Sequence, residues 1–414
     1  MASESVSDLT EEQIGARLLA RLRSGKGREN PYPIYEIMRG VGPVLSTPWG
    51  GLLATGYDAC SELLKGSSWE AVSACWRDAH LPDWRRHQAV VDLTDSLILM
   101  NPPGHTEQRQ VIAPHMSVRA VQSLTPVVER LVSERMDALE YALQRDGKAD
   151  FARLVSSALP VSVLCALLGL PQADSAFLDG LARAMSPVQE LSPTERQLLV
   201  ADEAVRSIRN YITARVPEHR TLQKPGLLTT LVESEDQGTG GGLRADVLTA
   251  VLLGAGRDTT SAMLASTALI VMTHRSQAAW LADNPHAIPA AVHEISRWDP
   301  AAQVVSRVAA QDTELAGIPV QRGQLATALI GAAHRDPTVF PDPNRLDFSR
   351  APGRLLTFGV GAHYCVGAAL AQMQTRLVVS SLLDRFPTLQ LAGKVERPPG
   401  VAFREVTSLP VELG

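Results

Sequence analysis

The chain has few cysteines, no excess of basic charge and no long apolar run. Its 414 residues include 39 Lys and Arg against 44 Asp and Glu, a net charge of −5. No segment is densely basic, so the charge pattern does not indicate a nucleic-acid surface. The most apolar stretch, residues 154–170, contains Pro160 and three Ser. It is therefore shorter than the roughly 20 mostly apolar residues that span a membrane, and no membrane span is predicted.

The cysteine content also excludes two structural classes. The four cysteines are Cys60, Cys75, Cys165 and Cys365. They lie far apart and show no C-x-x-C spacing, so neither a zinc ribbon nor a disulfide framework is indicated. The N-terminal residues carry charges where a signal peptide needs an apolar run. We therefore expect a cytoplasmic protein with reduced thiols.

Helical periodicity dominates the sequence, in which 45% of residues are hydrophobic. Apolar residues recur at i, i+3 and i+4 spacing in six segments: 121–143, 155–168, 193–216, 243–274, 287–298 and 368–386. Strand-like patterns are confined to residues 43–54, residues 304–328 and a predicted C-terminal hairpin over 400–411. These patterns predict a mainly α fold with small β-sheets. We see no internal repeat or domain seam, so we expect one domain over 31–414, preceded by a flexible extension, 1–30.

The predicted helix over 243–274 has an unusual centre. It reads Gly254-Ala255-Gly256-Arg257-Asp258-Thr259-Thr260. Each mid-helix Gly costs about 1 kcal/mol relative to Ala, and Thr is a weak helix former. One interpretation is close packing against another helix. The other is a helix that is thinned and locally loosened beside a ligand, with an acid and an alcohol on the next turn.

A second unusual segment, TFGVGAHYCVG over residues 357–367, precedes an Ala-rich predicted helix. A cysteine at a helix N-terminus lies at the positive end of the helix dipole, which lowers its pKa and favours thiolate. Gly359, Gly361 and Gly367 remove side chains around Cys365, so a flat body could lie close to the backbone. A buried structural thiol is the first alternative. A nucleophilic cysteine is the second, although no His or Asn follows an order typical of cysteine hydrolases.

The pattern F-G-x-G-x-H-x-C-x-G in this segment resembles the haem-ligand loop of the cytochrome P-450 family, and the resemblance extends from about residue 31 to residue 410. It implies the family's fold, in which a long central helix crosses a single haem domain. It also implies haem b as cofactor, with Cys365 as the axial thiolate ligand of the iron. Further residues implied at the cofactor are Phe358, Gly359, Gly367, Ala255 and Gly256. The central-helix motif resembles the family's oxygen-activation motif, which implies that Asp258 shuttles protons and that Thr259 hydrogen-bonds the oxygen.

The resemblance also assigns residues outside the two motifs. Glu294 and Arg297 match the family's E-x-x-R motif, which implies a structural triad with Arg345 of the P-x-R segment. Four further residues match positions that bind the haem propionates: His105, Arg109, Arg307 and His363. Each alone is an ordinary surface cation. Together they imply four donors for two carboxylates, as charge-assisted hydrogen bonding requires.

The resemblance locates the substrate pocket only in outline. The positions of five residues relative to the family motifs imply that they form the pocket wall: Ile98, Val251, Gly254, Val305 and Phe403. Glycine at position 254 suggests room for a bulky substrate. The segment 66–100 holds Trp69, Trp76 and Trp84, each of which either contacts substrate or anchors the loop.

The resemblance implies a soluble bacterial-type monooxygenase that receives electrons from a ferredoxin and its reductase. We expect it to oxidise, most simply to hydroxylate, a bulky apolar small molecule, free or bound to a carrier protein. Tailoring of polyketides, macrolides or peptides, including antibiotics, is typical of such enzymes. The alternative is a haem-thiolate protein with a peroxide-driven, coupling or non-turnover ligand-binding role. A cysteine hydrolase without haem is a third class.

Overall fold

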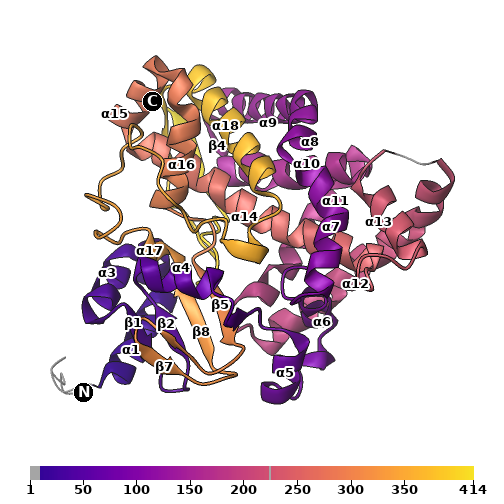
Figure 1. The fold of residues 1–414 in the computed structure, drawn as a ribbon. Helices are drawn as coiled ribbons and strands as arrows, with labels where there is room; N and C mark the ends of the chain where they lie inside the picture. Colours follow the sequence, from indigo (N-terminus) through magenta and orange to yellow (C-terminus); the bar gives the residue numbers. More distant parts are fainter. Residues whose placement is uncertain (1–9, 223–224) are drawn as a thin grey trace.

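The computed structural model describes residues 10–222 and 225–414, and one long helix, α14 (Ala245–Thr273), crosses their centre (Figure 1). The other α-helices are α1 (Glu11–Arg23), α2 (Gly25–Glu29), α3 (Tyr32–Val41), α4 (Tyr57–Lys65), α5 (Ala74–His80), α6 (Gln88–Thr94), α7 (Gly104–Met116), α8 (Val118–Ser123), α9 (Thr125–Asp146), α10 (Ala158–Leu168), α11 (Ser175–Met185), α12 (Glu195–Leu222), α13 (Leu227–Asp236), α15 (Arg275–Asp283), α16 (Ile288–Trp298), α17 (Ile330–Ala333) and α18 (Ala368–Arg385). Short 3₁₀ turns include η5 (Ser186–Gln189) and η7 (Gly361–His363), and Ala152–Ser156 form a π-helical turn.

The strands form three small sheets. They are β1 (Val44–Ser46), β2 (Leu52–Ala54), β3 (Trp69–Glu70), β4 (Lys148–Asp150), β5 (Val304–Ala309), β6 (Thr313–Leu315), β7 (Ile318–Val320), β8 (Leu325–Leu329), β9 (Leu389–Leu391) and β10 (Pro410–Leu413). The largest sheet has the order β1-β2-β8-β5-β3, and only the β2–β8 pair within it is parallel. The mainly α fold with small sheets is as predicted.

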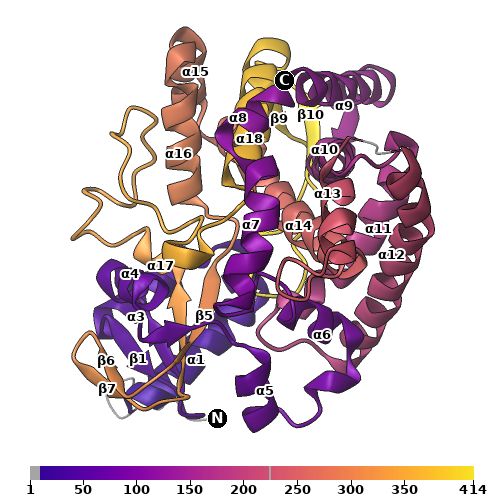
Figure 2. The same ribbon diagram turned by 45° about the vertical axis from the view of Figure 1, so that its right-hand side comes forward.

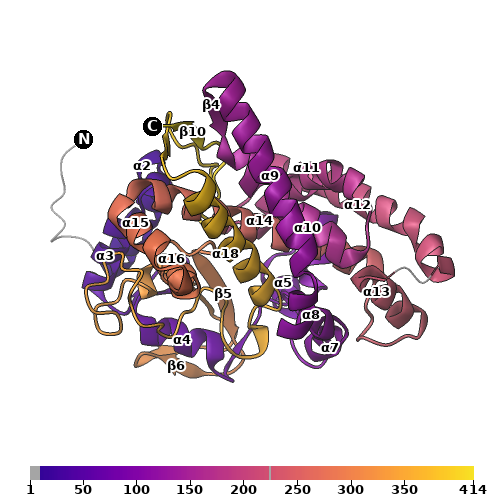
Figure 3. The same ribbon diagram turned by 90° about the horizontal axis from the view of Figure 1, so that it is seen from above.

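The central helix α14 is buried along most of its length, and most of its buried residues are apolar. At 1.5 Å per residue its 29 residues span about 44 Å. It packs against α10, α11 and α12 and against α16 and α18. Figure 2 shows α11 and α12 side by side, and Figure 3 shows α18 between α16 and α9. Residues of α14 belong to two separate hydrophobic clusters, one with α9–α13 and one with α16, so α14 is a shared wall between them.

The six helical segments predicted from periodicity are all helical, with two internal changes. The segment 121–143 is divided at Leu124 into α8 and α9, because Pro126 at the start of α9 has no N–H to continue the preceding helix. The segment 155–168 begins as a π-helical turn before α10. The helix α14 is continuous, so the local loosening considered for its centre is not observed.

The predicted C-terminal hairpin over 400–411 is wrong. The strand β10 instead pairs with β9 and with β4, placing Val411 opposite both Leu391 and Ala149. Residues 400–409 form a loop with two isolated bridges, Ala302 with Phe403 and Glu396 with Ser408. The cross-strand partners of β10 therefore come from distant parts of the chain. The loop before β10 does not pair with it and contacts α14 through Glu405.

The prediction of a flexible N-terminal extension is also wrong where the structure describes it. The Thr10 side chain accepts a hydrogen bond from the Gln13 backbone N–H, and the Gln13 side chain accepts one from the Thr10 N–H, which forms a capping box at the start of α1. The helices α1 and α2 together span residues 11–29 except for Ser24. Leu18 and Leu22 are buried in a cluster with α3 and strands of the large sheet. Residues 1–9 lie outside the described residues. Among the described helices, none combines the length and apolarity that crossing a bilayer requires.

Candidate active site

The cysteine loop owes its shape to two glycines in the left-handed region. Gly359 has φ +68° and Gly361 has φ +73°, conformations that side chains rarely adopt. The backbone N–H of Cys365 donates to the carbonyl of Phe358 at 2.7 Å and closes the loop. A Cβ at Gly367 would lie 4.0 Å from Cys365 Sγ. The loop therefore places Cys365 immediately before α18.

The helix dipole and burial act in opposite directions on the pKa of the Cys365 thiol. Burial raises the pKa of this thiol, and the Gly367 N–H and the Arg109 charge offset that effect only partly. Without a bound metal, desolvation therefore favours the neutral thiol. A metal cation at the sulfur would reverse this balance, because a coordinating thiol is deprotonated.

Four nitrogen-bearing side chains converge beside this loop. His105 and Arg109 come from α7, Arg307 from β5 and His363 from η7. The rings of His105 and His363 have centroids 4.2 Å apart. Burial, followed by the charges of Arg307, His105 and Arg109, lowers the pKa of His363 to about 3. The structure therefore brings together all four residues that the sequence nominates for the propionates.

These four side chains have no anionic partner among the described residues. Arg307 is 8% exposed and donates to the carbonyl of Ser306 at 3.0 Å, and burial lowers its pKa to about 10. Arg109 donates to the carbonyl of Tyr364 at 2.7 Å. Both ring nitrogens of buried His105 lack a hydrogen-bond partner. Buried cations and donors without an anion are unfavourable, so this cluster fits a bound group that carries carboxylates.

Haem fits these residues on three counts. The cation cluster matches two propionates, Cys365 offers sulfur for the iron, and glycines allow a flat ring close to the backbone. The central helix α14 gives a further observation that fits haem. Near the centre of buried α14, Ala255, Gly256 and Thr259 are partly exposed. Since Ala255 and Thr259 are four residues apart, they lie on one face of the helix.

The glycines of α14 have different explanations. A Cβ at Gly256 would lie 3.1 Å from Leu164 Cδ1 of α10, so close helix packing explains this glycine, and its place at the cofactor stays a prediction. A Cβ at Gly254 would meet Met185 Cε at 3.7 Å, an ordinary contact. Position 254 therefore faces α11, and its role in the substrate pocket stays a prediction.

Thr259 and Asp258 occupy different environments on α14. The Thr259 hydroxyl donates to the carbonyl of Ala255 at 2.9 Å, which leaves its oxygen able to accept a hydrogen bond. Asp258 is fully buried, and its Oδ1 accepts from Arg257 at 2.8 Å while its Oδ2 lacks a partner. Burial raises the pKa of Asp258 to about 7, against the charge of Arg257. An acid that titrates near neutral pH is suited to proton transfer.

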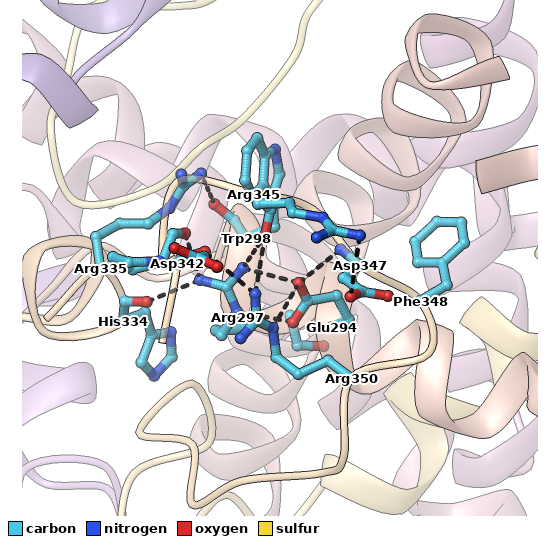
Figure 4. A network of polar contacts seen from close by, with 12 residues as sticks. Glu294, Arg297, Trp298, His334, Arg335, Asp342, Arg345, Asp347, Phe348 and Arg350 are labelled. Atoms are coloured by element: carbon cyan, nitrogen blue, oxygen red, sulfur yellow. Dashed lines mark hydrogen bonds and ion pairs between the residues drawn. The ribbon is translucent and has the colours of Figure 1, made fainter. Parts of the chain in front are cut away.

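The structural triad differs from the prediction in one residue (Figure 4). Glu294 and Arg297 form a buried bidentate pair at 2.7 and 2.8 Å. The third arginine is Arg350, whose Nε lies 3.3 Å from Glu294 Oε1. The predicted member, Arg345, has a side chain that is 68% exposed and contributes its backbone carbonyl to Arg297 at 3.2 Å. The prediction of Arg345 is therefore wrong, since the chain turns its side chain outward.

The predicted pocket residues come from several elements. Ile98 packs against the helical core cluster and Val305 against the cluster below the large sheet. Val251 is buried one turn before Ala255, and Phe403 forms the bridge with Ala302. That these residues and Gly254 line one pocket stays a prediction.

The three tryptophans of segment 66–100 anchor that segment. Trp69 is 8% exposed and pairs through β3 with β5, and Trp84 is 6% exposed and donates to Asp78 at 2.9 Å. Trp76 donates to the carbonyl of Gly323 at 2.7 Å. These contacts favour the anchoring interpretation over substrate contact.

The fold and site define a haem-thiolate oxidoreductase. A family model described as Cytochrome P450 matches residues 286–405. The chain is 31% identical over 406 residues to Vitamin D(3) 25-hydroxylase of Pseudonocardia autotrophica, covering 95% of this chain and 96% of the relative. It is 28% identical to Polyketide biosynthesis cytochrome P450 PksS of Bacillus subtilis, covering 93% of each chain.

The solved structure of Mycobacterium smegmatis CYP164A2 in its ligand-free state superposes with a TM-score of 0.85 and 28% identity, covering 96% of this chain and 100% of that one. The chain belongs to the cytochrome P450 family. It is a cytochrome P450 monooxygenase that uses haem as its cofactor and takes electrons from redox partners.

Proposed function

We propose that this monooxygenase hydroxylates a bulky apolar small molecule in secondary-metabolite tailoring. The observation that carries the proposal is the pairing on α14 of a buried, protonatable acid, Asp258, with a partly exposed alcohol, Thr259. Peroxide-driven relatives have little need of such a pair, because they do not deliver protons to molecular oxygen. The acid–alcohol pair therefore favours oxygen activation over the peroxide-driven and ligand-binding alternatives.

When bound, haem supplies the oxygen activation and the transfer of oxygen to substrate. The protein residues have supporting tasks. Cys365 holds the iron and His105, Arg109, Arg307 and His363 hold the propionates, where the four donors satisfy two carboxylates. Buried residues that flank Ala255 on α14, such as Val251 and Asp258, would limit water beside the haem.

Proton transfer is assigned to the two consecutive α14 residues. Asp258 Oδ2, which has no protein partner, gives up a proton toward the distal side and is reprotonated from solvent. The Thr259 hydroxyl donates to Ala255 in the resting structure and accepts a hydrogen bond from a water or from the acid. The acid that gives up the proton and the hydroxyl that accepts the hydrogen bond are therefore consecutive residues of α14.

The substrate class is inferred from the named relatives and from the predicted pocket wall. Two relatives are named for vitamin D(3) hydroxylation and polyketide biosynthesis, which supports an apolar substrate or a polyketide, macrolide or peptide. The predicted wall residues Ile98, Val251, Val305 and Phe403 are all apolar. A ferredoxin with its reductase is the proposed donor.

Thr259→Ala tests the proton-transfer assignment. We expect haem content and substrate binding to be retained, while electrons are diverted from product into hydrogen peroxide. The measurement is product formed per reduced nicotinamide consumed, beside Thr260→Ala as a matched control on the next residue. Asp258→Asn should instead slow oxygen consumption by about 10²-fold or more. An unchanged ratio and unchanged peroxide in Thr259→Ala would exclude a catalytic role for this hydroxyl.

A substrate screen tests the substrate class. Purified ferric protein is titrated with apolar polyketides, macrolides, cyclic peptides and steroids, and the haem spin-state change is followed in the visible spectrum. Compounds that bind are then incubated with ferredoxin, reductase and reduced nicotinamide, and hydroxylated product is identified by mass spectrometry. Turnover with hydrogen peroxide alone at the same rate would instead favour the peroxide-driven alternative.

A further inference from the structure

Arg257, the residue before Asp258, is the centre of a buried ionic cluster. It is 1% exposed and contacts three carboxylates: Asp258 Oδ1 at 2.8 Å, Glu405 Oε1 at 2.6 Å and Asp179 Oδ1 at 3.1 Å. Its remaining nitrogen donates to Ser157 Oγ at 3.3 Å. The residue therefore contacts three carboxylates from three separate segments of the chain.

The charges in this cluster do not balance. One guanidinium faces three carboxylates, and within the described ranges no second cation forms an ion pair with Asp179, Asp258 or Glu405. Full ionisation would leave two uncompensated negative charges in a region of low dielectric. Such a cluster retains a proton, and Asp258 is the most buried of the three acids.

The two outer carboxylates link Asp258 to two other parts of the fold. Asp179 lies on α11, and Glu405 lies on the loop that precedes β10. The same loop is attached to the segment after η5, because Glu190 Oε2 accepts from the backbone N–H groups of Val401 at 2.9 Å and Ala402 at 3.2 Å. A displacement of α11 or of this loop therefore changes which carboxylates share Arg257.

Glu405 also connects the cluster to solvent. Its side chain is 12% exposed, whereas that of Asp258 is 1% exposed. Glu405 lines a small cleft of about 20 Å³ together with Arg28, Phe403 and Arg404. A volume of this size holds about one water molecule. Because Asp258 and Glu405 both accept from Arg257 Nη1, the solvent-side carboxylate and the buried acid are held next to each other.

We propose that Arg257 is a positioning residue that, through Glu405 and Asp179, sets the protonation of Asp258 according to the packing of the C-terminal loop and α11. When both outer carboxylates share the guanidinium, Asp258 keeps its proton. When one of them withdraws, Arg257 favours the ionised form of Asp258 and the proton is released. This inference rests on the proposed role of Asp258 and adds the residues that control it. The other polar group facing Asp258 is Ser186 of η5.

The test measures the protonation of Asp258 directly. The carboxylic acid C=O stretch of Asp258 is identified in infrared spectra of the purified ferric protein as the band lost in Asp258→Asn, and its intensity is followed against pH. Glu405→Gln and Asp179→Asn each remove one negative charge and keep the side-chain shape. In both, we expect the midpoint to fall by about one pH unit, a tenfold change in proton concentration. Arg257→Gln should move the midpoint in the opposite direction.

A matched control separates this effect from general charge changes. Glu396→Gln removes a negative charge from an exposed residue that lies outside the cluster, and should leave the midpoint unchanged. The pH profile of product formed per reduced nicotinamide should shift with the infrared midpoint. Equal midpoints in wild type, Glu405→Gln and Asp179→Asn, or the absence of any protonated Asp258 band, would overturn the proposal. If Arg257→Gln does not fold, the two amide variants decide the question alone.

Failure of the proposed function gives a different result. If Asp258→Asn consumes oxygen at the wild-type rate, Asp258 is not the proton donor, and the role proposed for it is wrong. The infrared midpoints of Glu405→Gln and Asp179→Asn still report whether Arg257 controls Asp258. The two outcomes are therefore distinguishable in the same set of proteins.

Discussion

Replacing Arg350 should destabilise the protein far more than replacing Arg345, although the two lie in the same loop. The Arg350 side chain is 17% exposed and contacts Glu294 Oε1 at 3.3 Å. It also donates to the carbonyls of Pro341 at 2.7 Å, Asp342 at 3.2 Å and Arg345 at 3.1 Å. The contact with Glu294 ties the loop before the cysteine segment to α16, and the three carbonyl contacts hold the loop itself together.

The expected cost follows from the environment of each contact. Losing a hydrogen bond to a buried charged group costs about 1.5–3 kcal/mol. The three carbonyls lie at the exposed edge, where water replaces the lost donor at about 0.5 kcal/mol each. Arg350→Ala should therefore lower the free energy of unfolding by about 3–4.5 kcal/mol. Arg345→Ala should change it by less than about 0.5 kcal/mol, because its contact to Asp347 is a 3.8 Å surface pair.

Urea unfolding followed by tryptophan fluorescence measures both variants, and the Soret band reports haem retention in the same samples. The slope of the unfolding free energy against urea should stay constant, so that the midpoints are comparable. A double-mutant cycle with Glu294→Gln should give a coupling energy for Arg350 and none for Arg345. Equal destabilisation by the two alanine variants, or a larger effect of Arg345→Ala, would refute the assignment of Arg350 to the triad.

Three further predictions concern the cofactor site and the proximal core. Cys365→Ser should abolish the red-shifted Soret band of the reduced carbon monoxide complex, and retention of that band would contradict thiolate ligation by this residue. Arg307→Ala should lose haem to an acceptor protein roughly 10–100-fold faster, since a charged hydrogen bond contributes about 1.5–3 kcal/mol, and a wild-type rate would argue against the propionate contact. The pKa of His334, which accepts from the Leu356 N–H, is lowered to about 3 chiefly by burial. The unfolded chain takes up this proton below about pH 6.5, so stability should fall as pH decreases from 6.5 toward 3 by up to about 1.4 kcal/mol per pH unit, and urea unfolding of His334→Gln should show a shallower pH slope.

The sequence predicted the helices well because their burial pattern is local. The periodicity that marks α18 or α16 is contained within one segment of chain. Strand pairing is not local, which explains the error over residues 400–411. The partners of β10 lie at 148–150 and 389–391, and no pattern within the last 15 residues encodes that choice.

The site shows the same division between local and distant information. The motifs located Cys365, the propionate cluster and the pair on α14, because family spacing is preserved in the chain. They did not distinguish Arg345 from Arg350, since Arg345 ends the P-x-R segment, Arg350 follows it closely, and only the turn of the backbone decides which side chain reaches Glu294. Asp179 and Glu405, which contact Arg257, lie 78 and 148 residues from it in the sequence. The sequence signal for this cluster was an arginine in the middle of a helix predicted to be buried.

The shared-wall position of α14 has a consequence for engineering this enzyme. Because this helix contributes to two hydrophobic clusters, a change in its tilt or volume would disturb both at once. Larger or smaller residues along α14 should therefore reduce expression before they alter substrate choice. The loop 400–405 holds the predicted pocket residue Phe403 and packs against one hydrophobic cluster, through Val401. Mutant libraries that seek new substrates should be concentrated there, with α14 kept constant as the scaffold.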